Sequence, residues 1–270
     1  TRGFNNKKNL YKTLVRKRIL YNLLEENFSD PRLCQLFSRY ATYVGGSPFL
    51  SPSLLSLIWN VESQGVWRVK NGMHELPKCM EKIAKKTGTD FRYGFSVKEI
   101  IINNNKVKGV KLESGEEIQA EIVLYNGDPG AIGNGLLGKE IKHSVSQKNI
   151  SPRSLSAYVW AFSAKSNGLE LVHHNVFFNN NYKREFEDIA NGIMPTDPTL
   201  YLCAQGNNKD PTPIVNEIGR FEIIINAAPI LNEERPDKYE EFNKCKKITS
   251  PRLESMGLKL KFDPKPEMLT

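Results

Sequence analysis

The segment from Ser96 to Asp128 reads SVKEIIINNNKVKGVKLESGEEIQAEIVLYNGD and decides how the middle of the chain folds. Its runs SVKEIII, KVKGVKLE and EIQAEIVLY are joined by the turn sequences NNN and SGE, a pattern that predicts an antiparallel meander of two hairpins. Upstream, NGMHELPKCMEKIAKKTG predicts an amphipathic helix closed by Gly88, between short strands at GVWRV and TDFRYGF. The pattern indicates a β-α-β-β-β unit.

The residues before this unit predict three helices. An apolar stripe with Lys and Arg between its members predicts the first helix from Leu10 to Phe28. The second is expected within SDPRLCQLFSRYATYVGG, with Ser29 or Asp30 as its cap, Pro31 in its first turn and two glycines at its end. The third runs from Pro52 to Gln64.

The residues after Pro152 predict a second sheet. Four strand candidates are SLSAYVWAF, HHNVFF, TLYLCAQ and RFEIIINAA. A short helix is expected at Tyr182–Ile189, and a last helix begins at Asp237, where Pro251 must kink or break it. The expected fold class is therefore α/β in the wider, α+β sense.

The composition is that of a globular protein with a sizeable core, because 39% of its 270 residues are hydrophobic. A net charge of +8 raises affinity for phosphate-bearing partners, although an ordinary soluble surface with extra lysines is favoured. The four widely spaced cysteines indicate neither a zinc motif nor a disulfide framework, and a reducing compartment is expected. No apolar run approaches the roughly 18 to 20 residues that cross a bilayer. The chain begins and stops in ordinary sequence, and we expect an internal fragment.

Residues Gly133–Gly138 read GNGLLG, the glycine spacing of a dinucleotide-binding loop. Such a loop directly follows a strand and opens a helix, whose backbone N–H groups then point at the pyrophosphate. Here the preceding strand is expected to end near Tyr125, eight residues earlier, and the following segment is too short for a crossover helix. We therefore interpret GNGLLG as a flexible surface loop.

The sequence offers no metal site, no hydrolase site and no nucleic-acid module. His173 and His174 are adjacent in an expected strand, so their side chains should point to opposite faces and cannot share a metal. No Ser, Cys or Lys stands in a nucleophile frame such as G-x-S-x-G. Tyr40 and Tyr43 could stack on bases, but three residues apart on one helical face they are better explained by packing.

Three blocks of this chain resemble the middle of a phytoene desaturase type carotenoid desaturase, an FAD-dependent, amine-oxidase-like family. The blocks are LFSRYATYVGGSPFLSP, GVWRVKNGMHELPKCMEKIAKKTGTDFRYGFSVKEI and KVKGVKLESGEEIQAEIVLYNGD, and the resemblance is strongest to the hydroxyneurosporene or methoxyneurosporene dehydrogenase branch. It implies a partial FAD-binding domain of the glutathione-reductase type over residues 65–130. Residues 1–64 would be the helical part of a substrate domain, and residues 131–270 its part with the antiparallel sheet. The family's phosphate loop would lie upstream of Thr1.

The resemblance also implies a small set of cofactor-binding residues. Val97 matches the strand position whose main chain meets the adenine, a role that any β-forming residue can fill. Asn126, Gly127 and Asp128 match the family's Asn-Ala-Asp beside the flavin, with Gly127 departing from the usual Ala. Gly72 and Met73 match the family's GGM turn, which reads NGM here.

The implied reaction is flavin-dependent desaturation of an acyclic carotenoid, with the reacting carbon held in a dry apolar slot lined from FSRYATYVGGSPFL and SLSAYVWAF. No catalytic acid or base is indicated, and the fragment should bind FAD poorly alone. A peripheral contact with the cytoplasmic face of a membrane is expected through the basic, apolar segment NNKKNLYKTLVRKRILYNLL, while an ordinary packed helix is an equal alternative. The rival functions are a non-catalytic carotenoid or lipid carrier, and a carotenoid isomerase or retinoid saturase. No oligomeric state is indicated.

Overall fold

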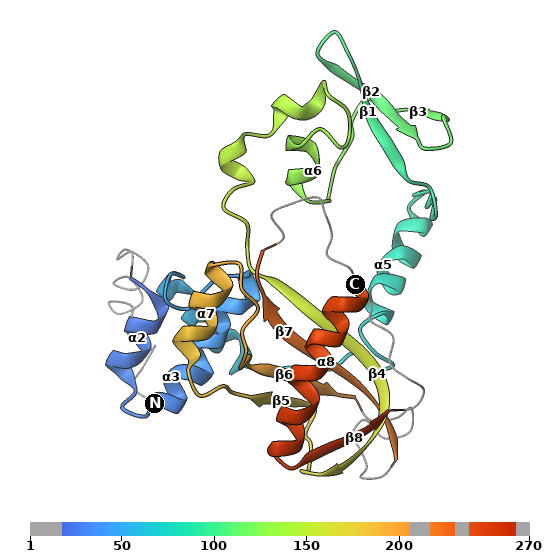
Figure 1. The fold of residues 1–270 in the computed structure, drawn as a ribbon. Helices are drawn as coiled ribbons and strands as arrows, with labels where there is room; N and C mark the ends of the chain where they lie inside the picture. The colour runs from blue at the N-terminus through green and yellow to red at the C-terminus, as the bar shows by residue number, and fades with distance from the viewer. Residues whose placement is uncertain (1–17, 206–216, 230–237, 263–270) are drawn as a thin grey trace. The chain divides into compact units, whose positions relative to one another are not determined.

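The computed structural model describes residues 18–205, 217–229 and 238–262 (Figure 1). These residues fall into two compact units. The larger unit holds the described segments up to Trp67 and from Ser154 onward, and the smaller unit runs from Arg68 to Arg153. Residues 131–153 therefore lie with the meander and not with the larger sheet.

The larger unit is built on a five-stranded antiparallel sheet in the order β5-β6-β7-β4-β8. The strands are β4 (Ser156–Gly168), β5 (His174–Phe177), β6 (Leu200–Ala204), β7 (Ile218–Ala227) and β8 (Leu258–Phe262). Alternate residues of these strands point to one face and form the main core, in which Leu202 and Ile223 are fully buried. Figure 1 shows helix α8 (Lys238–Ser255) lying across this sheet, and its Leu253 belongs to the same core.

A group of short helices forms a second core in the larger unit. Its members are α2 (Leu20–Asn27), α3 (Pro31–Ser38), the 3₁₀ helices η1 (Arg39–Val44) and η2 (Ser53–Ser56), and α4 (Leu57–Glu62). Helix α7 (Tyr182–Ala190), from the second half of the chain, lies outside this core. As expected, Asp30 caps α3 by accepting the Arg32 N–H at 2.9 Å, and Pro31 occupies the first turn. The Phe49 ring connects α7 to this group, with its centroid 6.0 Å from that of Phe186.

The smaller unit consists of a helix, a meander and a loop-rich end. The elements are α5 (Glu75–Lys86), β1 (Val97–Asn103), β2 (Lys106–Leu112), β3 (Glu117–Gln119), α6 (Pro129–Gly133), η3 (Ile141–Ser144) and η4 (Gln147–Asn149). The meander is confirmed, with β2 between β1 and β3. Asn104 and Asn105 both have positive φ, at 50° and 57°, as the two-residue hairpin turn between β1 and β2 requires.

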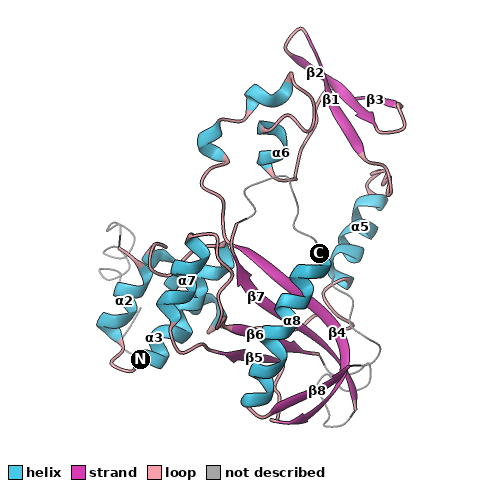
Figure 2. Cartoon of the chain, viewed as in Figure 1, coloured by secondary structure: helices cyan, strands magenta, loops and turns pink. Residues whose placement is uncertain are grey.

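Four expectations about the elements are wrong. GVWRV and TDFRYGF form no strand, and the meander ends at Gln119, so EIVLY is extended loop (Figure 2). A strand is stable only when a neighbour accepts its backbone hydrogen bonds, and none of the described residues pairs with these three segments. The fourth error is the helix from Leu10, because Ile19 is extended and bridges to Pro52, and α2 begins only at Leu20; residues before 18 lie outside the described part.

Two further features of the C-terminal part of the larger unit concern helix α8 and a strand after it. Of the two outcomes expected at Pro251, a kink or a break, the break does not occur, because helix α8 continues through this residue. One backbone hydrogen bond is lost at a proline, and the buried Leu253 just beyond it offsets that loss by packing into the core. Strand β8 was not anticipated, although Leu258, Leu260 and Phe262 alternate with lysines in the period of two that marks a strand.

Candidate functional site

The first candidate cofactor contact, Val97, opens strand β1 at the edge of the meander. β1 pairs with β2 along one side only, and Val97 lies opposite Leu112. The Val97 side chain is 40% exposed. The outer edge of β1 is held at Ile100, whose N–H donates to the Leu137 carbonyl at 3.0 Å, so the main chain around Val97 is the part of this edge that a flat ring could approach.

The turn at Gly72 and Met73 leads into helix α5. Gly72 has φ of 99°, and no heavy atom lies within 4 Å of the position that a Cβ would occupy. Its N–H donates to the Val69 carbonyl at 3.0 Å, and Met73 is exposed. The main chain of this turn is therefore open on the side where a side chain would stand, which fits a close approach by a planar group.

Asp128 is the last of the three residues Asn126–Asp128 that were expected beside the flavin, and it has a structural role in this unit. Its carboxylate accepts the Gly130 N–H at 2.8 Å, which caps helix α6, and it forms an ion pair with Arg153. The hydrogen bond from Arg153, followed by that from Gly130, lowers the pKa of Asp128 to about 2. Asp128 is thus an ionised cap that fixes the turn beside Asn126 and Gly127.

Gly127 matters more to local packing than its sequence suggested. The Tyr125 hydroxyl lies 2.3 Å from the position of a Cβ at Gly127 and donates to the Asp128 carbonyl at 3.3 Å. An alanine here would displace the Tyr125 ring, so the change from the family's usual Ala does more than loosen a turn. The structure describes no hydrogen bond or ion pair that joins Val97, the Gly72 turn and Asn126–Asp128 to one another.

The GNGLLG stretch has the wrong geometry for a phosphate loop. Helix α6 ends at Gly133, where the loop would have to begin a helix. Gly135 and Gly138 have positive φ and lie in the turns that follow. The first element after them is the single 3₁₀ turn η3. These glycines close a helix and do not open one, so the arrangement that aims N–H groups at a pyrophosphate is not formed.

The larger unit presents a candidate substrate face on its sheet. The side opposite α8 carries half-buried residues from the three central strands: Val159, Ala161, Tyr201, Glu222 and Ile224. Of the residues of SLSAYVWAF that were expected to line a slot, the aromatic Trp160 and Phe162 point instead into the core beneath α8. Strand alternation leaves the smaller Val159 and Ala161 on the open side.

The residues that the helical segment was expected to contribute to the slot are partly buried and partly exposed. Tyr40 is buried and donates to Glu62 at 2.8 Å, whereas Tyr43 is exposed and reaches the same carboxylate at 3.4 Å. Their ring centroids are 5.6 Å apart, as expected for neighbours on one helical face. Val44 and Leu50, from the same stretch of sequence, are exposed.

Sequence reasoning missed a buried carboxylate at one end of the central strands β6 and β7. Glu185 on α7 is 1% exposed and accepts hydrogen bonds from Asn179 at 2.9 Å, Thr199 at 2.7 Å and Asn226 at 3.1 Å. Desolvation raises its pKa, and the hydrogen bonds from Thr199 and Asn226 oppose that rise. An acidic residue inside the helical repeat of YKREFEDIA resembles a solvated charge, so only the fold identifies it as buried.

A second cluster contradicts the geometric expectation for the adjacent histidines. The ring centroids of His173 and His174 are 4.4 Å apart, and a ligand atom of each lies within 4.8 Å of the other and of the Cys203 sulfur. Strand β5 begins at His174, so His173 precedes it at a bend, where the alternation of a strand does not apply.

Comparison with known proteins places these features in a family. The model of the flavin-containing amine oxidoreductases matches residues 13–213. The chain belongs to this family. The flavin-containing amine oxidoreductases use a flavin as cofactor, which agrees with the FAD expected from the sequence.

The chain is similar to proteins named as hydroxyneurosporene and 1-hydroxycarotenoid desaturases. It is 44% identical over 249 residues to the hydroxyneurosporene desaturase of Rhodobacter capsulatus, covering 92% of this chain and 49% of that protein. It is 36% identical over 251 residues to the enzyme of the same name from Rubrivivax gelatinosus, covering 93% and 47%. The 1-hydroxycarotenoid 3,4-desaturase of a Flavobacterium species is 40% identical over 180 residues, covering 66% and 36%. The chain thus spans about half the length of the first two relatives.

The fold has a counterpart among solved structures. An oxidoreductase from Methanosarcina mazei aligns with a TM-score of 0.58 at 14% identity, covering 94% of this chain and 59% of that one. At this identity the likeness concerns the fold alone. It agrees with a mixed architecture of helices and antiparallel sheets.

Proposed function

We propose that this chain serves in a flavin-dependent desaturase that acts on an acyclic carotenoid such as a hydroxy- or methoxyneurosporene, in carotenoid biosynthesis. The observation that carries the proposal is the 44% identity to a hydroxyneurosporene desaturase across 92% of the chain. Because the chain spans about half of such relatives, the activity is assigned to a polypeptide that contains this chain together with the rest of the flavin domain.

The smaller unit is proposed to be a segment of a glutathione-reductase-like FAD-binding domain. Val97 would contact the adenine through its main chain, and the open turn at Gly72 and Met73 would lie against the cofactor. Asn126 and Gly127 would border the flavin, held in place by the Asp128 cap. The exposed edge around Val97 and the empty space beside Gly72 support this arrangement.

The chemistry divides simply between cofactor and protein. When bound, the flavin supplies the acceptor for the hydride that leaves the saturated carbon pair. The larger unit would hold the polyene against its open sheet face, where Val159, Ala161 and Ile224 provide small or apolar side chains and exclude water. No side chain of this face needs to act as an acid or a base.

A matched pair of glycine variants tests the cofactor site in the reading frame that contains this chain. Gly72 and Gly88 have φ of 99° and 94°, and neither has an atom within 4 Å of its Cβ position. Gly72→Ala and Gly88→Ala therefore introduce similar backbone strain at the two ends of α5. Gly72→Ala should lower the FAD retained after purification, while Gly88→Ala should retain it; equal retention would remove Gly72 from the site.

The reaction itself is tested in a host that accumulates hydroxyneurosporene. Expression of the reading frame should shift the pigment absorption to longer wavelength, because each desaturation extends the conjugated system. A product of unchanged composition with altered geometry would instead indicate an isomerase. Pigment bound without any change would indicate a carrier.

We further propose that the protein collects its substrate at the cytoplasmic face of a membrane. A carotenoid is nearly insoluble in water, and the basic, apolar segment over residues 5–24 is suited to a peripheral contact. Most of this segment lies outside the described residues. None of the helices in the described part is both long enough and apolar enough to cross a bilayer. The protein should float with liposomes that contain anionic lipid and not with liposomes that lack it. If it floats with neither kind of liposome, the proposed contact is contradicted.

A further inference from the structure

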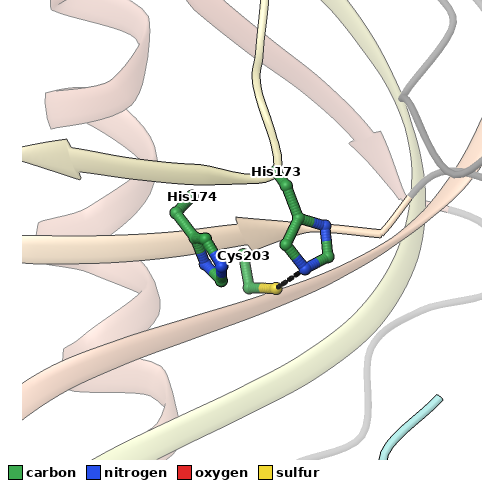
Figure 3. A group of neighbouring side chains, drawn as sticks. All are labelled: His173, His174 and Cys203. Atoms are coloured by element: carbon green, nitrogen blue, oxygen red, sulfur yellow. Dashed lines mark hydrogen bonds between the residues drawn. The ribbon is translucent and has the colours of Figure 1, made fainter. Parts of the chain in front are cut away.

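The geometry points to a binding site for a thiophilic transition-metal ion, with Zn²⁺ as the reference ion, formed by His173, His174 and Cys203. One ligand atom of each residue lies within 4.8 Å of the others. Figure 3 shows the Cys203 side chain between the two imidazole rings. This inference rests on the larger unit alone and is independent of the proposed desaturase activity.

The backbone brings the three residues together through one strand pair. His174 is the first residue of β5 and lies directly opposite Cys203 of β6 in the antiparallel register. Residues paired in this way project to the same face of a sheet. His173 stands at the bend just before β5, and the Ala204 N–H donates to its carbonyl at 2.9 Å, which fixes the bend against β6.

Hydrogen bonds at the far side of each ring prepare the histidines to bind. The His173 Nδ1 lies 3.0 Å from the Ala204 carbonyl oxygen. A carbonyl only accepts, so Nδ1 carries the proton, and in the neutral ring Nε2 has the lone pair. That Nε2 lies 3.8 Å from the Cys203 sulfur. The His174 Nδ1 lies 2.7 Å from the Tyr201 hydroxyl, a second contact of the outer kind that orients metal-binding histidines.

The spacing suits a small ion with sulfur and nitrogen ligands. Zn–N bonds of about 2.0 Å and Zn–S bonds of about 2.3 Å place tetrahedral ligand atoms about 3.5 Å apart. The 3.8 Å between His173 Nε2 and the Cys203 sulfur is close to that value. All three ligand atoms lie within 4.8 Å of one another, so side-chain shifts of about 1 Å would bring the set to bonding distance. Three protein ligands leave the fourth position to a water molecule.

The donor set also selects the class of metal. Thiolate and imidazole favour Zn²⁺ and Cu(I), whereas Mg²⁺ and Ca²⁺ require oxygen ligands. Cys203 is 7% exposed and His174 is exposed, so the site has a buried anchor and an open side for entry. Binding converts the Cys203 thiol to a thiolate and releases its proton to solvent.

Metal titration of the 270-residue chain tests the site. Zn²⁺ should bind at one equivalent in competition with a chromophoric chelator, and Co²⁺ should produce a thiolate-to-metal charge-transfer band. Mg²⁺ should compete with neither ion. Tyr201→Phe should weaken Zn²⁺ binding by about tenfold, because it removes an outer hydrogen bond while retaining the three ligands.

Two ligand variants and two controls decide the outcome. Cys203→Ser should abolish the charge-transfer band, and His174→Ala, at an exposed position that the fold tolerates, should lower Zn²⁺ affinity by more than Tyr201→Phe does. Cys79→Ser and His143→Gln change a thiol and an imidazole in the smaller unit and should leave both signals intact. Zn²⁺ binding that survives both ligand variants, or a charge-transfer band that Cys79→Ser removes, overturns the site.

Discussion

The five-stranded sheet of the larger unit and the meander of the smaller unit are both antiparallel, yet they are stabilised differently. The sheet packs Leu202, Ile223 and Leu258 at 0% exposure beneath α8. In the meander and its neighbouring elements the buried apolar side chains are Ile100, Leu112 and Ile132. Each Å² of apolar surface removed from water contributes about 25 cal/mol. The larger unit, which buries more apolar side chains, is therefore expected to be the more stable of the two.

Helix α5 shows the contrast most directly. It has the apolar stripe of a helix that covers a sheet, but none of its residues is buried. The loop after β3 likewise leaves Leu124 92% exposed. Such surfaces are normally covered by protein. The smaller unit therefore has the features of one layer of a larger domain, which agrees with a chain that spans about half of its relatives' length.

Local signals shape the meander, and long-range signals shape the larger sheet. The meander is specified by turns such as Asn104–Asn105, within a few residues of the strands they join. The sheet depends on pairing β4 with β7, where Ser156 lies opposite Ala227. Its register is set by which face of each strand becomes buried.

The largest expected effect is the difference in stability loss between one leucine variant in each unit. Leu202→Ala should lower the free energy of unfolding of the larger unit by about 2 to 5 kcal/mol, because it opens a cavity in the core. Leu124→Ala should change stability by less than about 0.5 kcal/mol, because its side chain is already in water. Hydrogen exchange followed by mass spectrometry measures both segments in one experiment. Equal protection losses would show that the smaller unit has a core of its own around Leu124.

The next effect concerns the buried carboxylate of the larger unit. Glu185→Ala leaves the donors of Asn179, Thr199 and Asn226 without their acceptor and should cost about 2 kcal/mol or more. Burial raises the pKa of Glu185 in the folded state, so its effect on stability is most favourable below pH 4.5 and declines as pH rises through the folded pKa.

Glu185→Gln is the control for that charge effect. Its amide keeps an acceptor for Asn179 and Thr199, and Asn226 can rotate its own amide to match the new NH₂ group. Tryptophan emission reports only on the larger unit, which holds Trp59, Trp67 and Trp160. In urea unfolding, Glu185→Gln should remove the decline with pH. A decline that persists in this variant would assign it to another group.

The elements that could be predicted are those with local signals. The Asp30 cap with Pro31, the meander turns and the alternation in four of the five strands of the larger sheet are each readable within a few residues. Strand β8 had the same signal, but its place beside β4 depends on residues about ninety positions away in sequence. The strands predicted at GVWRV and TDFRYGF failed for the converse reason, because strand-forming residues without a neighbour remain loops.

The candidate sites follow the same rule. The flavin-facing residues came from a resemblance to a family and remain proposals. The cluster of His173, His174 and Cys203 depends on a bend before β5 and on a strand register, neither of which has a sequence signature. Tyr125 over Gly127 is likewise a contact that only the folded chain reveals.

A smaller effect is expected from the exposed stripe of α5. Leu76, Met80 and Ile83 are 48%, 65% and 59% exposed and lie on one helical face. Replacing all three with Gln should reduce binding of a hydrophobic dye and change helix stability by less than about 0.5 kcal/mol for each site. Lys82→Gln on the same helix is the control and should leave dye binding unchanged. A large loss of α5 helicity in the triple variant would show that the stripe is already packed.

The last effect lies at the Asp128 cap of the smaller unit. Asp128→Ala should destabilise the turn by about 1 kcal/mol, because the Gly130 N–H loses its acceptor. The pKa of Asp128 is lowered to about 2, so its stabilisation is complete above pH 3.8 and is lost as pH falls through about 2.

Arg153→Ala should return the pKa of Asp128 toward 3.8, since the hydrogen bond from Arg153 is the largest cause of the shift, and NMR titration of the side-chain carboxyl measures it directly. Lys148→Ala, which removes a positive charge of the same unit that does not contribute to the shift, should leave the titration near pH 2. If Arg153→Ala also leaves it there, the Gly130 cap alone sets the pKa, and the turn beside Asn126 and Gly127 is held by backbone geometry instead of by the ion pair.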